Sequence, residues 1–247
     1  MWNNNTWGAG YMKFKRVILK ISGEALSNGK DVKYDMDFVS SVCKEVKKCT
    51  DAGAQIGIVI GGGNYWRGVK DGSGKIERVS ADKMGMLATC MNCIAVADVF
   101  RTIGAKVKVM TAFTIEGTAE RYDPLKAIEY LEDGYIVLFA GGTGMPFVST
   151  DTGAALRACE IHADCILLAK NVDGVYSADP VKDPSAVKYD EISFDEVLDK
   201  KLQVMDLTAT TMAMENKISA MVFSLSDIGR LNDALNGERV GTVVYTE

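Results

Sequence analysis

The sequence of 247 residues is poor in histidine: it contains only His162, in the stretch ACEIHADCILL, without a catalytic partner motif. Chemistry built on a histidine base is therefore not expected, and we assign His162 a structural role. A G-x-S-x-G nucleophile elbow is also missing, which disfavours the common serine hydrolases.

Long apolar runs and an excess of positive charge are missing too. No uninterrupted apolar run approaches the roughly 18 residues that span a bilayer, and no signal peptide is visible. The formal net charge of −5 disfavours a nucleic-acid-binding protein, which usually carries a basic stripe. We therefore expect no membrane or nucleic-acid partner, and the hydrophobic content of 47% predicts a globular protein with a sizeable core.

Neither common phosphate-binding fingerprint occurs, since the chain has no G-x-G-x-x-G and no G-x-x-x-x-G-K-[ST]. Its six cysteines include one C-x-x-C pair, Cys90 and Cys93, inside the helical stretch MLATCMNCIAVADVF. No second Cys or His pair lies nearby, so we interpret the cysteines as small buried residues in a reducing, cytoplasmic protein. The other four are Cys43, Cys49, Cys159 and Cys165.

What the sequence does contain is an alternation of short β-rich runs and helical patterns. This order predicts an α/β fold, a three-layer sandwich with a mainly parallel central sheet covered by helices on both faces. We interpret residues 1–11 as a flexible tail, with Met12 as the candidate functional start, and residues 12–247 as one domain with lobes at about 12–165 and 166–247. Strands are expected at 16–21, 55–60, 106–110, 135–140, 165–169, 220–224 and 242–246, and long helices at about 36–52 and 80–103.

The predicted helix at about 80–103 carries an apolar stripe of five residues. We interpret this stripe as core, with a subunit interface as the alternative for so long a helix. The stripe consists of Met84, Leu87, Met91, Ile94 and Val99.

Loops rich in glycine and small polar residues follow four predicted strands. They are KISG (20–23), GGGN (61–64), GGTGMPFVSTD (141–151) and KNVDGVYSADP (170–180). In an open parallel sheet, ligands bind beyond the carboxyl ends of strands, where small residues let backbone N–H groups approach them. A tight turn explains any single loop, but several such loops together indicate a ligand site.

Three charged residues accompany these loops: Lys20, Arg67 and Asp151. Asp151 stands at the start of a predicted helix, whose N-terminus favours anions. Together with the glycines, these residues predict a polyanionic ligand. Phosphoryl transfer suits the set because it requires positioning and charge compensation rather than a histidine base.

Six motifs, in this order, resemble those of the bacterial-type uridylate kinases (UMP kinases) of the amino acid kinase superfamily. They are ILKISGEAL, GIVIGGGNYWRG, ADKMGMLATCMN, GGTGMPFVSTDTGAALRA, AKNVDGVYSADPVKDP and VMDLTA, and the similarity extends from about Lys15 to the C-terminus. The resemblance implies the amino acid kinase fold, which binds ATP without a P-loop. It also implies transfer of the ATP γ-phosphoryl group to UMP, giving UDP and ADP, with Mg²⁺ in pyrimidine nucleotide biosynthesis.

The resemblance also implies which residues bind each nucleotide, with UMP on the N-terminal lobe and ATP on the C-terminal lobe. The implied ATP-binding residues are Lys20, Ile21, Ser22, Gly23, Gly63, Arg67, Lys170, Asn171, Tyr176 and Asp179. The implied UMP-binding residues are Gly62, Asp82, Thr143, Gly144, Met145, Pro146, Phe147, Val148, Ser149 and Thr150.

Three residues are implied at the reaction centre: Lys20, Asp151 and Asp206. The two aspartates would organise the lysine or the Mg²⁺–phosphate assembly, and helix N-capping is the alternative for each. No protein motif for direct metal ligation is present, so Mg²⁺ is expected to arrive through the ATP phosphates. No general base is required, because the accepting UMP phosphate oxygen is already ionised.

The chain departs from the family pattern at two places. Met145 replaces an Asn associated with reading the pyrimidine base, which shifts discrimination against CMP toward Thr143 and backbone groups. The segment SNGKDVKYD (27–35) differs from the stretch linked to GTP activation in some relatives, so GTP is only a candidate activator. UTP is the expected inhibitor, and the resemblance implies a homo-oligomer, typically a hexamer.

Two other functions compete with this interpretation. A kinase of the same fold with a carboxylate or carbamate acceptor is one, and the segments TGMPFVSTD and ADKMGMLA favour UMP over it. A catalytically silent nucleotide sensor is the other, and the joint presence of Lys20, Arg67 and Asp179 argues against it.

Overall fold

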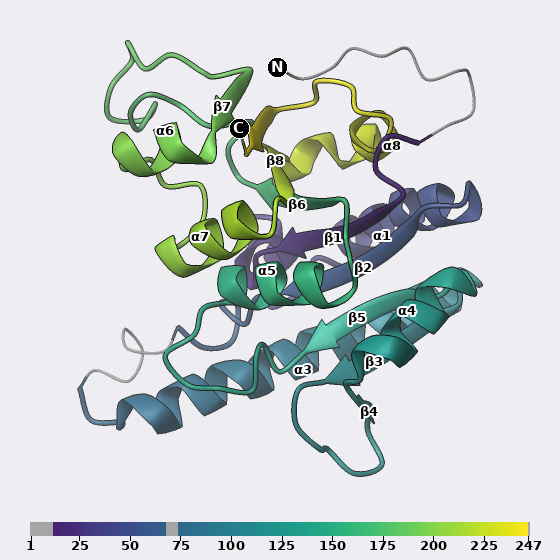
Figure 1. The fold of residues 1–247 in the computed structure, drawn as a ribbon. Helices are drawn as coiled ribbons and strands as arrows, with labels where there is room; N and C mark the ends of the chain where they lie inside the picture. The colour runs from purple at the N-terminus through teal and green to yellow at the C-terminus, as the bar shows by residue number, and fades with distance from the viewer. Residues whose placement is uncertain (1–11, 68–73, 247) are drawn as a thin grey trace.

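The computed structural model describes residues 12–67 and 74–246, so the expected tail at 1–11 lies outside the described residues. Nine strands within the described part form one sheet, in the order β4-β3-β5-β2-β1-β6-β8-β9-β7 (Figure 1). Neighbouring strands are parallel except β8 and β9. The strands are β1 Arg16–Ile21, β2 Gln55–Ile60, β3 Val107–Thr111, β4 Glu120–Arg121, β5 Ile136–Ala140, β6 Cys165–Lys170, β7 Glu191–Ser193, β8 Ser219–Ser224 and β9 Thr242–Tyr245.

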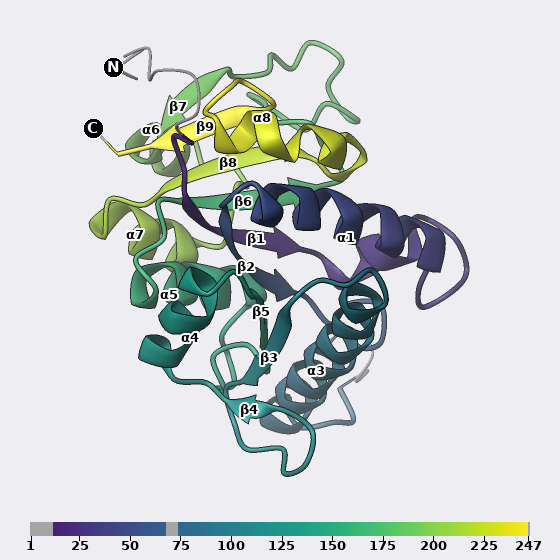
Figure 2. The ribbon, with the colours of Figure 1, turned by 90° about the vertical axis from the view of Figure 1, so that its right-hand side faces the viewer.

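Helices cover both faces of this sheet (Figures 1 and 2). One face carries α1, α3 and α8 with the short 3₁₀ helices η1 and η2, and the other carries α4 to α7. Their bounds are η1 Gly23–Ser27, α1 Met36–Asp51, α3 Arg78–Thr102, α4 Pro124–Glu132, α5 Thr150–Glu160, α6 Phe194–Asp199, α7 Leu207–Glu215, η2 Leu225–Arg230 and α8 Leu231–Leu235.

The central strand β1 shows how the sequence produces these layers. Val17, Leu19 and Ile21 belong to the core under α1 and α3, whereas Ile18 belongs to the core under α4 to α7. Successive side chains along a strand point to opposite faces of the sheet. A strand with apolar side chains on both faces must therefore be covered by helices on both faces. The predicted three-layer α/β fold is therefore confirmed. The short strands β4 and β7 were not predicted, because two and three residues leave no readable pattern.

The apolar stripe of α3 does not lie in the core, so that prediction is wrong for four of its five residues. Met84, Leu87, Met91 and Ile94 are 40%, 50%, 45% and 39% exposed, and only Val99 is buried. The helix buries its other side instead, with Cys90, Cys93 and Ala97 against the sheet and α1. Its length and composition alone would suit a membrane span, but half of that stretch is buried inside the protein, as in the core helix of a globular fold.

Most of the cysteines lie in the core, as expected for small buried residues, whereas the histidine lies on the surface. Five of the six cysteines are buried, and none of the six forms a disulfide within the described residues. Burial raises the pKa of the Cys43 thiol to about 12, which suits an unreactive core residue. His162 is exposed just after α5, with a φ of +54° and its backbone N–H donating to the Cys159 carbonyl.

Candidate active site

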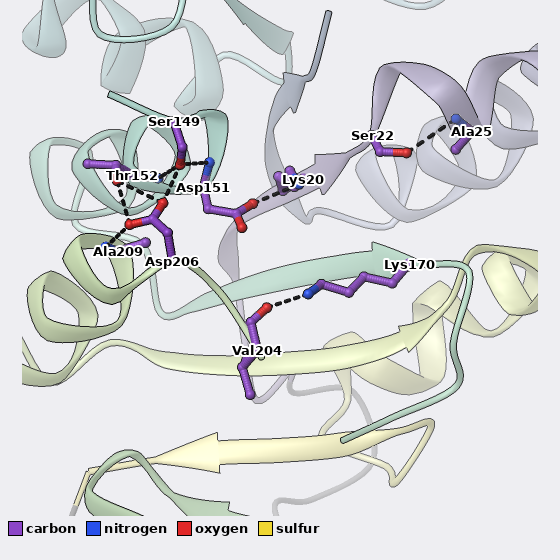
Figure 3. A network of polar contacts seen from close by, with 10 residues as sticks. All are labelled: Lys20, Ser22, Ala25, Ser149, Asp151, Thr152, Lys170, Val204, Asp206 and Ala209. Carbon is purple, nitrogen blue, oxygen red and sulfur yellow. Dashed lines mark hydrogen bonds and ion pairs between the residues drawn. The ribbon is translucent and has the colours of Figure 1, made fainter. Parts of the chain in front are cut away.

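The carboxyl ends of β1, β2, β5 and β6 bring the glycine loops together around one ion pair, between Lys20 and Asp151. Lys20 Nζ lies 2.7 Å from Asp151 Oδ1, and the two side chains are 13% and 19% exposed (Figure 3). Among the described residues, the lysine is the one polar partner of this carboxylate oxygen. A mostly buried lysine that is held by a single carboxylate oxygen can also interact with an incoming phosphate.

The N-cap of α5 is Ser149, not Asp151. The Ser149 hydroxyl accepts hydrogen bonds from the Asp151 and Thr152 backbone N–H groups at 3.0 and 3.1 Å. Capping therefore does not explain Asp151, whose carboxylate points at Lys20 (Figure 3).

Asp206, by contrast, is a helix cap. Its carboxylate accepts from the Ala209 backbone N–H at the start of α7, at 3.0 Å. It also accepts from the hydroxyls of Ser149 and Thr152 on α5, so it ties α5 to α7 (Figure 3). Burial alone would raise the pKa of Asp206, but these hydrogen bonds outweigh burial and lower it.

Lys170 ends β6, near the same ion pair. Its ammonium group donates to the Val204 carbonyl (Figure 3). Burial lowers the pKa of Lys170, the charge of Asp151 raises it, and the charge of Lys20 lowers it. The two lysines and Asp151 therefore share one electrostatic environment.

The glycine loop after β2 packs closely against α3 at Gly62 and against η1 at Gly63. A Cβ on Gly62 would lie 2.7 Å from the Gly85 carbonyl, and one on Gly63 would lie 2.9 Å from Glu24 Oε1. Glycine at these positions therefore has a packing reason besides any approach of a ligand.

Asn92 anchors this loop and was not predicted. It is fully buried in α3, and its Nδ2 donates to the Gly61 carbonyl at 2.7 Å. Asn92 and Asn64 also exchange amide hydrogen bonds at 2.8 and 3.0 Å, and the Tyr34 hydroxyl donates to Asn92 at 2.9 Å. A lone Asn in the apolar stretch TCMNCIAV was the available signal, because a buried amide requires partners.

A cavity of about 460 Å³ lies between the glycine loop, the start of α3 and the loop from β5 to α5. We call it the acceptor cavity. Among the predicted UMP-binding residues, Gly144 and Pro146 are not part of its lining. Those that line it are Gly62, Asp82, Thr143, Met145, Phe147, Val148, Ser149 and Thr150, together with Gly63 and Arg67 from the predicted ATP-binding set.

Trp66 and Arg78 also line the acceptor cavity and were missed. The Trp66 indole N–H is buried and has no hydrogen-bond partner among the residues that the structure describes, and the Trp66 ring lies beside Gly85. Arg78 lies three residues before the start of the recognised segment ADKMGMLATCMN, so no motif marked it.

A second cavity, of about 440 Å³, contains three of the predicted ATP-binding residues: Lys170, Tyr176 and Asp179. We call it the donor cavity. The Tyr176 hydroxyl donates to Asp173 Oδ1 at 2.8 Å, and Asp179 Oδ1 accepts from the Val181 backbone N–H at 3.0 Å. Both side chains are thus held by local turn contacts.

A third cavity, of about 660 Å³, adjoins the first two through shared residues. It shares Gly63 and Arg67 with the acceptor cavity and Lys170 with the donor cavity, and it also contains Asn171. Arg67 Nη2 pairs with Glu24 Oε2 at 2.9 Å. The remaining predicted ATP-contacting residues, Ile21, Ser22 and Gly23, follow Lys20 along β1 into η1, where the Ser22 hydroxyl accepts from the Ala25 N–H at 3.2 Å.

No group of three His, Cys, Asp or Glu side chains in the described part of the chain could hold a metal ion. The two carboxylates predicted at the reaction centre are already engaged. Asp151 pairs with Lys20, and Asp206 accepts hydrogen bonds from Thr152 and from the Ala209 backbone N–H. The arrangement fits a metal that arrives with phosphate ligands rather than one caged by carboxylates.

Comparison with known proteins shows the family to which the chain belongs. A family model described as the amino acid kinase family matches residues 15–224. A uridylate kinase of Phocaeicola vulgatus is 46% identical over 233 residues, which are 94% of this chain and 99% of that protein.

Solved structures agree in fold. The UMP kinase of Bacillus anthracis superposes with a TM-score of 0.91 at 36% identity, covering 95% of this chain and 97% of the other. The UMP kinase of Ureaplasma parvum gives 0.89 at 32% identity, covering 95% and 100%. The uridylate kinase of Archaeoglobus fulgidus gives 0.68 at 28% identity, covering 92% and 99%.

Proposed function

Since the chain belongs to the amino acid kinase family, among its uridylate kinases, we propose that it transfers the γ-phosphoryl group of ATP to UMP, forming UDP and ADP. The observation that carries this proposal is the ion pair of Lys20 with Asp151, where the glycine loops meet. Asp151 follows Thr150 of the acceptor cavity, and the charges of both members of the pair act on Lys170 of the donor cavity. The reaction belongs to pyrimidine nucleotide biosynthesis, and its nucleotide substrates favour a cytoplasmic location.

Lys20 acts on the transferred phosphoryl group. In a loose in-line transition state, charge spreads over the equatorial oxygens, and a fixed ammonium group compensates it without reorganisation. Asp151 pairs with Lys20 and fixes the direction of its ammonium group, and Lys170 contributes a second positive charge from β6. The protein removes no proton, because the attacking UMP oxygen is already ionised.

Mg²⁺ would suit this centre if it arrived with the ATP phosphates, and it would then supply compensation of their negative charge. The residues here would meet it from outside that assembly, with Asp151 the nearest candidate carboxylate and Asp206 already saturated as a cap. Its role is therefore electrostatic and shared with Lys20 and Lys170.

UMP binds in the acceptor cavity with its phosphate toward the glycines. Gly62, Gly63 and Thr150 lie at the end of the cavity that adjoins β1 and α5, where the α5 N-terminus favours an anion. Asp82 and Met145 then meet the nucleoside part. A carboxylate accepts hydrogen bonds only, so Asp82 contacts ribose hydroxyls or a base N–H rather than the phosphate.

ATP binds in the donor cavity with its phosphates directed to Lys170 and Lys20. Tyr176 and Asp179 contact its nucleoside, and Ile21, Ser22, Gly23, Gly63, Arg67 and Asn171 complete its surroundings. We assign UMP to residues 12–165 and the ATP nucleoside to residues 166–247. UTP inhibits by occupying the acceptor cavity as a product-like nucleotide. GTP is a weaker candidate as activator, because segment 27–35 differs from the stretch linked to GTP activation in some relatives.

The chain assembles as a homo-oligomer, and a hexamer is the form that the family resemblance favours. The support within this chain is the exposed apolar face of α3, formed by Met84, Leu87, Met91 and Ile94. Four large apolar side chains along one face exceed the scatter of a monomer surface and suit burial against another subunit.

A steady-state ADP-release assay tests the reaction, with UMP, CMP, dUMP, acetylglutamate and carbamate as acceptors and with GTP or UTP added. UMP is expected to give the highest kcat/KM. Turnover with acetylglutamate or carbamate and none with UMP would instead identify a carboxylate or carbamate kinase of the same fold. No ADP with any acceptor would identify a nucleotide sensor.

A further inference from the structure

The start of α3 carries an ion pair beside the acceptor cavity. The Arg78 Nε–H group donates to both carboxylate oxygens of Asp82, at 2.9 and 2.8 Å. The Asp82 side chain is 17% exposed and that of Arg78 is 47% exposed, and both residues line the cavity. The pair differs from an ordinary surface pair because its acid is largely covered.

Both members of the pair also hold the loop from β5 to α5. The Phe147 backbone N–H donates to Asp82 Oδ2 at 2.7 Å, and the Arg78 guanidinium lies 5.2 Å from the centre of the Phe147 ring. Phe147 has a φ of +65°, a conformation that a bulky residue keeps only where its surroundings hold it. Arg78 and Asp82 thus fix a strained residue of the cavity wall.

We propose that Arg78 is a positioning residue of the acceptor cavity, which acts through Asp82 and Phe147. This inference rests on the proposed function, in which Asp82 contacts the nucleoside part of UMP. Arg78 lies one helical turn before Asp82, so its charge fixes the direction of the carboxylate from the side of α3. The same guanidinium lies against the Phe147 ring and steadies the loop through a cation–π contact.

The role of Arg78 is confined to acceptor binding. Its two partners lie at the nucleoside part of the cavity, whereas Lys20 and Asp151 form a separate contact at the reaction centre. Loss of Arg78 therefore weakens UMP binding in the ground state and the transition state alike. Such a loss raises KM and leaves kcat nearly unchanged.

The test compares Arg78→Ala with Arg78→Lys in a chain in which Trp2 and Trp7 are replaced by phenylalanine. Trp66, in the cavity lining, is then the remaining tryptophan of three, and its fluorescence reports UMP binding without ATP. For Arg78→Ala we expect the UMP Kd and KM to rise about tenfold, which corresponds to about 1.4 kcal/mol. The ATP KM and kcat change less than about twofold. Lysine keeps the charge without the planar guanidinium and restores only part of the affinity.

Arg230→Ala is the matched control. Arg230 Nε pairs with Asp233 Oδ2 at 3.2 Å, and its side chain is 49% exposed, close to that of Arg78, but it lines none of the three cavities. We expect Arg230→Ala to leave UMP binding unchanged. Phe147→Leu should weaken binding in the parent chain and add little to Arg78→Ala, because the ring contact is already lost.

An Arg78→Ala chain that binds UMP within about twofold of the parent would overturn the inference and leave the proposed function intact. A parent chain that binds UMP but releases no ADP would overturn the proposed function instead. If Arg78→Ala loses its cooperative thermal transition, Arg78→Lys and Phe147→Leu decide by the same criterion. Unchanged UMP affinity in both would then reject the positioning role.

Discussion

The acceptor and donor cavities are similar in volume, about 460 and 440 Å³, but differ in how they carry charge. Among the residues that the structure describes, the lining of the acceptor cavity includes no lysine, and its two arginines, Arg67 and Arg78, each pair with a carboxylate. The donor cavity is lined by one acid, Asp179, and four lysines. The lysines are Lys170, Lys182, Lys200 and Lys201.

This difference suits the two nucleotides. ATP carries more negative charge than UMP, and flexible ammonium groups provide attraction with little geometric demand. Planar guanidinium groups with fixed carboxylate partners provide direction instead. On the proposed function, the donor cavity would attract ATP mainly by charge, and the acceptor cavity would select UMP mainly by geometry.

The largest effect is expected at the ion pair of Lys20 with Asp151. Lys20→Ala removes the charge at the transferred phosphoryl group, so kcat should fall by about 100-fold or more. Steady-state kinetics with both nucleotides measures this, and KM for either should change far less. Asp151→Asn, which removes the partner of Lys20, should lower kcat by a smaller factor. A Lys20→Ala chain with full turnover would refute the role assigned to Lys20.

The contact between α5 and α7 should matter for stability. Asp206→Ala removes a cap and the acceptor for Ser149 and Thr152, so the free energy of unfolding should fall by about 1 kcal/mol or more. Asp206→Asn keeps the cap and loses less. Chemical denaturation measures both.

Asp206 should also make stability depend on acid. Its folded pKa lies below the usual value, so its ionised form favours folding above the unfolded carboxyl pKa of about 3.9. That contribution is lost as pH falls through the lower folded pKa. Thermal unfolding of Asp206→Asn should therefore lose less stability in this acid range than the parent chain. Equal acid sensitivity in Asp206→Asn and the parent chain would show that these contacts do not lower the pKa of Asp206.

A more moderate effect is expected at the donor cavity in alkaline solution. Burial lowers the pKa of Lys170, so its charge is lost at a lower pH than that of a surface lysine. The value of kcat/KM for ATP should fall on the alkaline side accordingly. Lys170→Arg should move this limb to higher pH, and an unchanged limb would assign it to another group.

The smallest effect concerns salt. If the donor cavity attracts mainly by charge, raising ionic strength from about 0.05 to 0.3 M should raise KM for ATP more than KM for UMP, because screening weakens exposed charges. Parallel measurement of both constants checks this. An equal or larger change for UMP would remove the distinction between the cavities.

Part of this account was readable in the sequence, because strand and loop patterns are local. The run RVILKI predicted β1 and the position of Lys20 near its end. The glycine loops predicted a ligand site at the carboxyl ends of the strands. Contacts across the fold were not readable: nothing in the sequence shows that Asp206 bonds to α5 or that Asn92 holds the loop after β2. The α3 stripe was misjudged, because an apolar periodicity marks one face of a helix without showing whether that face packs in the core of the same chain.

The central claim is that this chain moves a phosphoryl group from ATP to UMP. A single-turnover reaction with γ-³²P-labelled ATP and excess UMP, separated by chromatography, tests it most directly. We predict that the label appears in UDP at the rate at which ATP disappears, and that Lys20→Ala slows both equally. Label in inorganic phosphate, or no loss of ATP while UMP is bound, would contradict the claim.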